Sequence, residues 1–416
     1  MKNIIIAPAI LLFSLVGMQG QTLSEFYKNE TVKLEEVSEY SAQTDWNVLF
    51  SDYDNEWWGS EVAEMKSIAI APDGSVFMSH QTNYEIWKFD RQGKFIKAFG
   101  SKGNGKGEFV MRARVEGVLG GKYVYTTDEL GRMLFFDLDG NYVKSLKLDY
   151  GALQTVPLGD MKIAIFGHVP WSGHRYKHII AIKDYETGNE HIVWEEIIKP
   201  PIEIIELSDG LKMVAIMNFT HRAITRHGMA ASSEGTLLVA THSDGKVLEY
   251  STDGKELRSF PLKITPIQIK DADVQRIYEK QMAEFTKLND RFPEDGRLTE
   301  ENLDMMKEEY TKRFETGKDK IKAGDHLPIY STMIMDSDGN VLVFEYTEEN
   351  ESNKFRAYSY NLNGTLIGVT SFECPGYDLS YTNDSFVFHG GYVYAVATKK
   401  NVEGVPLRLV KFRLTE

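Results

Sequence analysis

Short stretches in which apolar and polar residues alternate recur along most of the chain, separated by turns rich in Gly, Asp and Asn. The segment 65–100 reads as an apolar strand, a small-residue turn, a β-branched and aromatic strand, a polar loop, an alternating strand, an Asp-Gly-type turn and a last strand. A copy begins at Ala113, shifted by 47 residues, and another begins at Gly228. A repeat of about 40–50 residues with this content predicts a β-propeller built from four-stranded blades.

Weaker copies begin at Lys162, Tyr330 and Ser385 and bring the number of predicted blades to six. The turn that joins the last two strands of a blade carries a glycine in five of them, and these are Gly93, Gly140, Gly188, Gly254 and Gly364. Their spacings of 47, 48, 66 and 110 indicate regular blades followed by one large insertion. The sequence therefore predicts an all-β, six-bladed β-propeller over residues 44–416.

The sixth copy stops after three strands, which leaves its outer strand missing. The apolar segment Trp46–Phe50 is an extra predicted strand without a blade of its own. Because a radial array of sheets must protect its edges, we expect this segment to pair with Leu407–Arg413 and close the ring.

The insertion covers about residues 269–323, between the predicted fourth and fifth blades, and its apolar residues recur every three to four positions. This period predicts two amphipathic helices, with the second starting near Thr299. The pair either packs on the rim of the ring or covers the opening of its channel. In the second case the apolar stripe of Ile277, Tyr278 and Phe285 should contact loops of neighbouring blades.

The first twenty residues have a positive start at Lys2, an apolar run from Ile4 to Val16 and a small-residue exit, as in a cleaved secretory signal. We expect residues 1–20 to be removed, 21–43 to form an N-terminal extension, and the mature protein to be periplasmic or extracellular without stable membrane insertion. A retained membrane anchor is the alternative, although the run is short for a span. No Cys follows the run, which argues against a lipoprotein.

The formal charge of −14 disfavours a nucleic-acid partner, because binding to phosphates needs a basic face. Cys374 is the single cysteine, so the chain cannot form an internal disulfide or a Cys-based metal cluster. Stability must come from the packing of a large core.

The residues Ala71-Pro72-Asp73-Gly74, Asn83, 86–90 and 99–103 resemble an NHL repeat. With the secretory signal and six blades, the chain resembles the secreted six-bladed propeller proteins of Bacteroidetes. His80 stands where NHL repeats usually carry Asp, and Thr127 and Thr241 stand there in two further copies. Any function that depends on that Asp is in doubt here.

In a four-stranded blade, the loop between the second and third strands and the connection to the next blade emerge at the same end. We call this end of the ring the loop face. The Gly-rich segment 100–107 belongs to it as a blade connection, since it lacks the Ser or Thr and the helix of a phosphate-binding loop. Because functional residues concentrate on loops held by a rigid scaffold, we expect a ligand site on this face.

The candidate ligand-binding residues on the loop face are imidazoles and carboxylates, and they are His80, Asp128, His168, His174, His242 and Glu345. Such groups bind Zn²⁺ or Ca²⁺, and His80, His242 and Glu345 are the metal-ligand candidates under a helical cover. None of them has a ligand spacing of its own, so the alternative is that they are ordinary solvated or hydrogen-bonded side chains.

Two classes of function stay open. The first is a non-catalytic binding or scaffold module for a protein, peptide or glycan, without a cofactor. The second is a metal-dependent hydrolase or lyase with its site at the central channel, which the resemblance implies because similar propellers include lactone hydrolases and lyases. We favour binding, since no set of nucleophile, base and orienting group can be named.

Overall fold

The part of the chain that this computed structural model describes begins at residue 22 and ends at residue 416. The residues left out within it are 51–65, 81–82, 111–112, 129–130, 172–174, 199–201, 207–211, 217–227, 242–244, 277, 280–281, 284–298, 323–325, 348–350 and 381–384. The predicted signal sequence, residues 1–20, lies outside the described residues.

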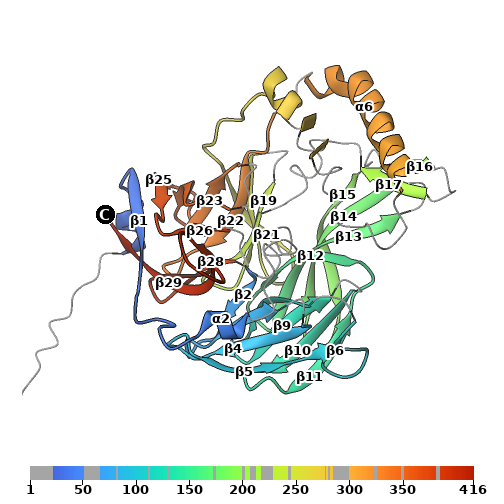
Figure 1. Ribbon diagram of the computed structural model, residues 1–416. Helices are drawn as coiled ribbons and strands as arrows, with labels where there is room; N and C mark the ends of the chain where they lie inside the picture. Colours follow the sequence, from blue (N-terminus) through green and yellow to red (C-terminus); the bar gives the residue numbers. More distant parts are fainter. Residues whose placement is uncertain are drawn as a thin grey trace, which may run out of the picture.

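Most strands form antiparallel sheets of four consecutive strands (Figure 1). The first sheet consists of β2 (Ile68–Ile70), β3 (Val76–His80), β4 (Glu85–Phe89) and β5 (Phe95–Phe99). The second consists of β8 (Ala113–Leu119), β9 (Tyr123–Asp128), β10 (Arg132–Asp137) and β11 (Tyr142–Lys147). The short strands β6 (Ser101–Lys102) and β7 (Glu108–Phe109) lie in the connection between these two sheets.

The third and fourth sheets repeat this plan. The third contains β12 (Gly151–Pro157), β13 (Lys162–Trp171), β14 (Arg175–Asp184) and β15 (Glu190–Ile198). The fourth contains β18 (Gly228–Ala231), β19 (Leu237–Thr241), β20 (Lys246–Tyr250) and β21 (Glu256–Pro261). Between them, β16 (Ile202–Glu206) and β17 (Lys212–Ile216) pair as a separate hairpin.

The fifth and sixth blades belong to one continuous sheet. The fifth contains β22 (Tyr330–Met335), β23 (Val341–Glu345), β24 (Lys354–Tyr360) and β25 (Leu366–Glu373). The sixth contains β26 (Tyr377–Leu379), β27 (Phe386–His389), β28 (Tyr392–Lys399), β29 (Leu407–Thr415) and the N-terminal strand β1 (Thr31–Glu36). The predicted repeat is thereby confirmed as an all-β array of propeller-like sheets.

The glycines predicted for the turns between the last two strands of a blade do occupy those turns. Gly93, Gly140, Gly188, Gly254 and Gly364 all have φ between 72° and 82°, a conformation that glycine adopts without strain. Adjacent sheets pack face to face through hydrophobic clusters, for example Phe77 of β3 with Val124 of β9. Another cluster joins the first blade to the last through Trp87 of β4 and Leu409 of β29, so the core follows a closed ring.

The ring is closed by β1, and the prediction that Trp46–Phe50 closes it is wrong. Leu34 of β1 pairs with Leu414 of β29 in antiparallel register, and Val32 pairs with Phe372 of β25 in parallel register. The missing outer strand thus comes from the N-terminal region, as expected, but from the segment predicted to be an extension.

The segment predicted as the closing strand contains the short helix α2 (Trp46–Leu49) instead. The Asp45 side chain accepts hydrogen bonds from the backbone N–H groups of Asn47 and Val48, at 3.1 and 3.3 Å, and thereby caps the helix. Its apolar residues serve packing, since Trp46 and Phe50 are buried in the cluster between the first and sixth blades. The apolar residues of this segment are therefore buried, but in a helix and not in the predicted strand.

A short N-terminal arm precedes β1 and fastens it to the fifth blade. Thr22 is the N-cap residue of the helix α1 (Leu23–Phe26), and the Leu23 N–H donates to Asp338 Oδ2 at 2.8 Å. The Tyr27 hydroxyl donates to the buried carboxylate of Asp336 at 2.9 Å. These contacts fix the position of β1 in the ring.

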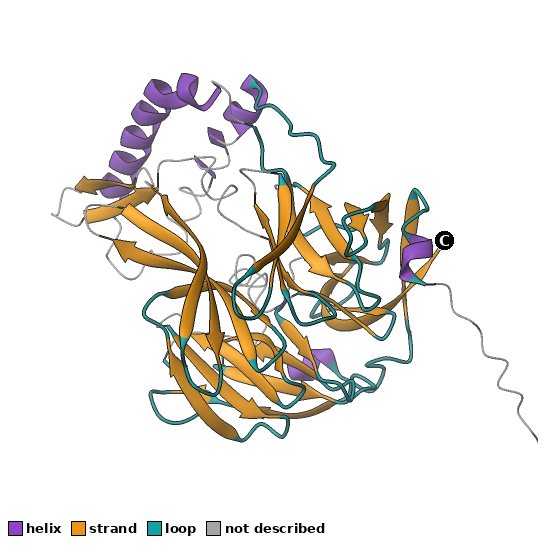
Figure 2. Cartoon of the chain, turned by 180° about the vertical axis from the view of Figure 1, so that it is seen from behind, coloured by secondary structure: helices purple, strands orange, loops and turns teal. Residues whose placement is uncertain are grey.

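Two helical segments follow β21 and precede β22 in the chain. Residues 271–276 and 278–279 belong to the first. The second is α6 (Glu300–Lys322), and Thr299 Oγ1 accepts from the Asn302 N–H at 3.2 Å at its start. One stripe of α6 is buried, and it consists of Leu303, Met306, Tyr310 and Phe314. The views of Figures 1 and 2 both show α6 away from the sheets of the first two blades.

The two helical segments pack on each other. Tyr278 stacks on Phe314 with ring centroids 4.6 Å apart, and its hydroxyl lies 3.1 Å from Thr311 Oγ1. These contacts place Tyr278 between the two helical segments, and its contact with loops of neighbouring blades stays a prediction. Ile277 and Phe285 lie outside the described residues. The chain enters and leaves the pair side by side, because Gln268 forms a β-bridge with His326.

Cys374 is a buried free thiol, and burial raises its pKa to about 12. Within the described part of the chain, no helix is long and apolar enough to cross a membrane.

The role of β1 can be tested with the substitution Leu34→Ala. Leu34 is 4% exposed, and truncation of a buried leucine costs about 2–5 kcal/mol of unfolding free energy. Val48→Ala in α2 is the control, because Val48 is 70% exposed and should change stability by less than about 0.5 kcal/mol. Urea unfolding of both variants gives the two values, and equal effects would contradict closure by β1.

Candidate functional site

His80 ends β3 and is completely buried. Its ring stacks on Trp87 at 4.3 Å and on Phe50 at 5.9 Å between centroids, and its Nδ1 accepts from the Asn83 N–H at 3.3 Å. The side chain is therefore part of the aromatic packing between the first and sixth blades. A role for His80 as a ligand-binding residue stays a prediction.

Asp128 ends β9 and is held by Arg132, the first residue of β10. Arg132 Nε donates to Asp128 Oδ2 at 2.7 Å, and the Arg132 backbone N–H donates to Oδ1 at 3.0 Å. The Asp128 side chain is fully buried, whereas that of Arg132 is 23% exposed. The carboxylate thus orients a guanidinium that reaches the surface.

The remaining candidates do not form a described cluster. His168 lies within β13, and partial burial lowers its pKa. Glu345 ends β23, with its carboxylate 3.9 Å from Arg356. His174 and His242 lie outside the described residues, so their roles stay predictions. Where the structure describes the chain, no three His, Cys, Asp or Glu side chains form a group that could hold a metal ion.

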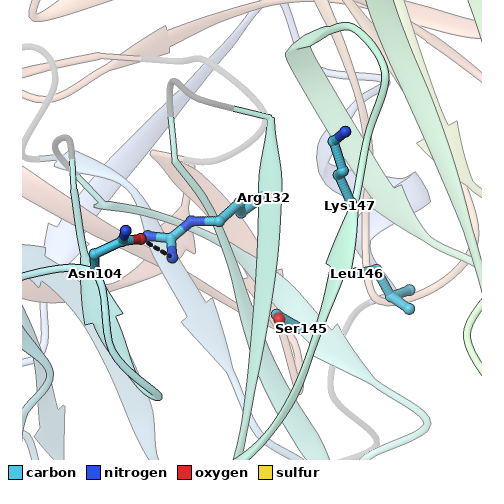
Figure 3. Close-up of a pocket in the computed structure, with 5 residues that line it drawn as sticks. All are labelled: Asn104, Arg132, Ser145, Leu146 and Lys147. Carbon is cyan, nitrogen blue, oxygen red and sulfur yellow. Dashed lines mark hydrogen bonds between the residues drawn. The ribbon is translucent and has the colours of Figure 1, made fainter.

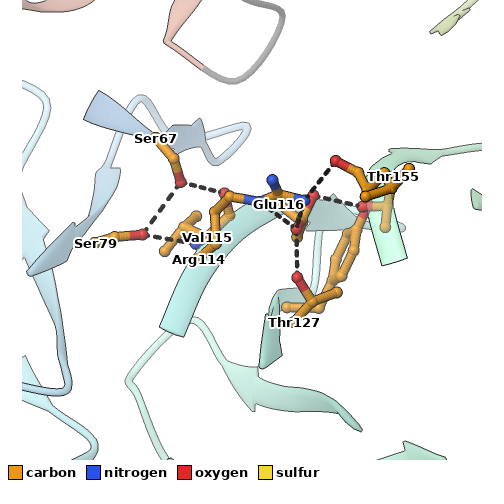
Figure 4. A network of polar contacts seen from close by, with 9 residues as sticks. Ser67, Ser79, Arg114, Val115, Glu116, Thr127 and Thr155 are labelled. Atoms are coloured by element: carbon orange, nitrogen blue, oxygen red, sulfur yellow. Dashed lines mark hydrogen bonds and ion pairs between the residues drawn. The ribbon is translucent and has the colours of Figure 1, made fainter. Parts of the chain in front are cut away.

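A buried carboxylate that the sequence analysis missed connects the second and third blades (Figure 4). Glu116, on the innermost strand β8, is 8% exposed. It accepts hydrogen bonds from Arg114 Nε at 2.7 Å, from the Thr127 hydroxyl and, at 2.9 Å, from the hydroxyl of Thr155 on β12. Thr127, noted above as a departure from the NHL pattern, is therefore a partner of Glu116.

A second set of polar contacts connects the first and second blades (Figure 4). The hydroxyls of Ser67 and Ser79 lie 3.1 Å apart. Ser67 donates to the Val115 carbonyl, and the Val115 N–H donates to the Ser79 hydroxyl at 2.7 Å. These bonds satisfy a backbone unit of β8 with side chains of the neighbouring blade.

A buried lysine connects the first blade with the last two. Lys66 immediately precedes the first blade, its side chain is fully buried, and it forms an ion pair with Glu351. Its ammonium also donates to the Thr398 hydroxyl of β28 at 3.0 Å, and that hydroxyl donates to Glu351 Oε2 at 3.0 Å. Burial lowers the pKa of Lys66, and the charge of Glu351 opposes this shift.

A hollow of about 340 Å³ lies at the end of the second blade (Figure 3). Its lining comes from the blade connection, the start of β10 and the outer strand β11, and consists of Asn104, Arg132, Ser145, Leu146 and Lys147. Arg132 pairs with Asp128 and with Lys147 in the sheet, so the hollow lies at the opposite end from the Gly140 turn. It therefore belongs to the loop face, where a ligand site was predicted.

The sequence contained usable signals for the residues that were missed. Glu116 is a single acidic residue in the otherwise apolar strand pattern 115–119, and Lys66 stands alone beside the apolar run 68–71. A charge in such a position is either at the surface or paired. Arg132 had no such signal, because a charged residue at the start of a predicted strand is ordinary.

The comparisons with known proteins agree with the fold. Residues 60–193 match a protein family described as a 6-bladed beta-propeller. No curated protein matches the chain.

The chain is similar to several solved structures at low identity. One is a protein of Bacteroides fragilis, with 11% identity, a TM-score of 0.49 and coverage of 85% of this chain and 91% of that one. Another is a member of the DUF4221 family from Bacteroides vulgatus, with 13% identity, a TM-score of 0.48 and coverage of 85% and 93%. A streptogramin B lyase has 11% identity, a TM-score of 0.38 and coverage of 85% and 84%.

The contribution of Glu116 can be measured with Glu116→Gln. The neutral amide weakens the charge-assisted bonds to Arg114 and to the two threonines, so we expect a loss of about 1–3 kcal/mol in unfolding free energy. Glu186→Gln, at an exposed turn position, is the control and should change stability by less than about 0.5 kcal/mol. Urea denaturation measures both, and an unchanged Glu116→Gln variant would show that the network contributes no stability.

Proposed function

We propose that this protein is an exported six-bladed propeller that binds a protein, peptide or glycan ligand without changing it chemically. The proposed site is the hollow on the loop face of the second blade. Its volume of about 340 Å³ is at the lower end of the range of small-molecule sites. It would therefore accommodate one sugar unit or one peptide side chain of a larger ligand.

The observation that carries this proposal is the fixed orientation of Arg132. Its guanidinium is bound to Asp128 on one side, and its Nη2 donates to the Glu108 carbonyl of the blade connection at 3.1 Å. A polar group that is held in place before the ligand arrives loses little conformational freedom on binding. This arrangement is typical of a recognition site.

The chemical nature of the lining favours binding over catalysis. The lining residues supply a guanidinium, an amine, an amide and a hydroxyl, together with the apolar Leu146. The described lining holds no imidazole, carboxylate or thiol, and these groups perform most general acid–base and nucleophilic catalysis near neutral pH. The buried networks around Glu116 and Lys66 support the same reading, since their members bond to each other.

The export part of the proposal depends on the sequence of residues 1–20. N-terminal sequencing of the protein secreted by its natural host should find a start near Gln21. A mature protein that begins at Met1 would contradict it.

The binding site can be tested by filling the hollow with Ser145→Trp. Ser145 is exposed on β11, so the indole should occupy the hollow without disturbing the core. Val143→Trp is the matched control, because Val143 is exposed on the same strand and face but outside the lining. With glycan and peptide arrays as the assay, we expect Ser145→Trp to lose the binding that the wild type and Val143→Trp show. Equal binding by all three would place the site elsewhere.

The metal content of the purified protein tests the alternative of a metal-dependent enzyme. We expect no stoichiometric Zn²⁺ or Ca²⁺ by elemental analysis, and the same array binding after treatment with EDTA. A stoichiometric metal whose removal abolishes binding would favour the enzyme class, with His80, His242 and Glu345 as the first residues to substitute.

A further inference from the structure

We infer that the hollow recognises the carboxylate group of a small monoanionic ligand or ligand unit. This inference rests on the proposed function, and it adds the chemical class of the bound group.

Arg132 presents one side of its guanidinium to the hollow. Nε and Nη2 are engaged by Asp128 and the Glu108 carbonyl. Nη1 makes one long hydrogen bond to Asn104 Oδ1, at 3.4 Å (Figure 3). Because a bond of this length is weak, the two N–H groups of Nη1 are the donors with capacity for a ligand oxygen.

Lys147 adds a second cation to the lining of the hollow. It pairs directly with Arg132 across β10 and β11, and like charges in such a position repel each other. The nearest carboxylate to its ammonium is that of Asp149, at 3.7 Å, and the two side chains are 83% and 92% exposed. Solvent screens an ion pair of this kind, so it competes weakly with a bound anion.

The donors of the hollow match a carboxylate group. The N–H groups of Arg132 Nη1 and the ammonium of Lys147 carry positive charge, and a carboxylate accepts charge-assisted hydrogen bonds from such donors. The carboxylates of Asp128, Glu108 and Asp149 lie near these cations and keep their own negative charges. These surroundings therefore favour a ligand group with one negative charge over a doubly charged phosphate.

The experiment compares matched ligands in which a neutral amide replaces the carboxylate. The probes are D-glucuronate and N-acetyl-L-alanine, and their neutral partners are D-glucuronamide and N-acetyl-L-alaninamide. Titrations followed by calorimetry or by protein NMR should show binding of at least one acid, and its amide should bind at least about tenfold more weakly. The affinity for the acid should also fall as NaCl is raised.

The site of binding is tested with Lys147→Glu, which should weaken binding of the acid by about tenfold or more. Lys147 is mostly exposed, so this variant should fold normally, and a thermal melt checks this. Lys97→Glu is the matched control, because Lys97 is an exposed lysine on the outer strand of the first blade. It should bind the acid like the wild type.

Several outcomes would overturn the inference. They are equal binding of acid and amide, loss of binding in both lysine variants, no binding of either acid, and tighter binding of inorganic phosphate than of the acids. In each case, array binding that is sensitive to Ser145→Trp would leave the proposed binding function standing. Loss of that sensitivity, with normal binding of the acids elsewhere on the protein, would instead remove the proposed site.

Discussion

The pairing of the N-terminal strand β1 with both β25 and β29 is the interaction on which the remaining structure depends. A ring of separate sheets has one junction where the chain begins and ends, and there the strand edges would stay open. Three kinds of contact close this junction. The strand β1 pairs at the outer edge, and the cluster that contains Trp87 and Leu409 packs nearer the middle of the blades. The ion pair of Lys66 with Glu351 lies further in. The ring is therefore closed by backbone hydrogen bonds, by burial of apolar side chains and by an ion pair.

The blade that carries the proposed site is attached to both of its neighbours by polar contacts. Glu116 joins the second blade to the third, and the Ser67–Ser79 contacts join it to the first. The spacing of Arg132 and Lys147 within this blade comes from their direct pairing across β10 and β11. The blade is therefore positioned in the ring by residues that are not part of the hollow.

The repeat predicted the blades well because each strand and turn there has a local cause, such as the glycine with positive φ at Gly93. The prediction of the closing strand was wrong because a strand that is buried on one face has few apolar residues. Thr31–Glu36 (TVKLEE) has just two, whereas Trp46–Phe50 (WNVLF) is mostly apolar and was therefore the stronger strand candidate. The aromatic cluster that buries Trp46 is a long-range contact, which local patterns do not contain. The sequence predicted a ligand site on the loop face and Asp128 as one of its residues, and both stay predictions. Arg132 was not predicted, because its partners come from separate loops that meet only in the fold.

The register of β1 also has a consequence for the order of events during synthesis. The strand at residues 31–36 leaves the ribosome early, yet its partners are residues 371–373 and 412–415, almost the whole chain length away. Contacts so distant in sequence form slowly, because a long loop must close before they contribute any stability. Folding can therefore be completed only after the entire polypeptide is available. A chain of this topology stays without its final contacts throughout translation, as the proposed export in unfolded form would require.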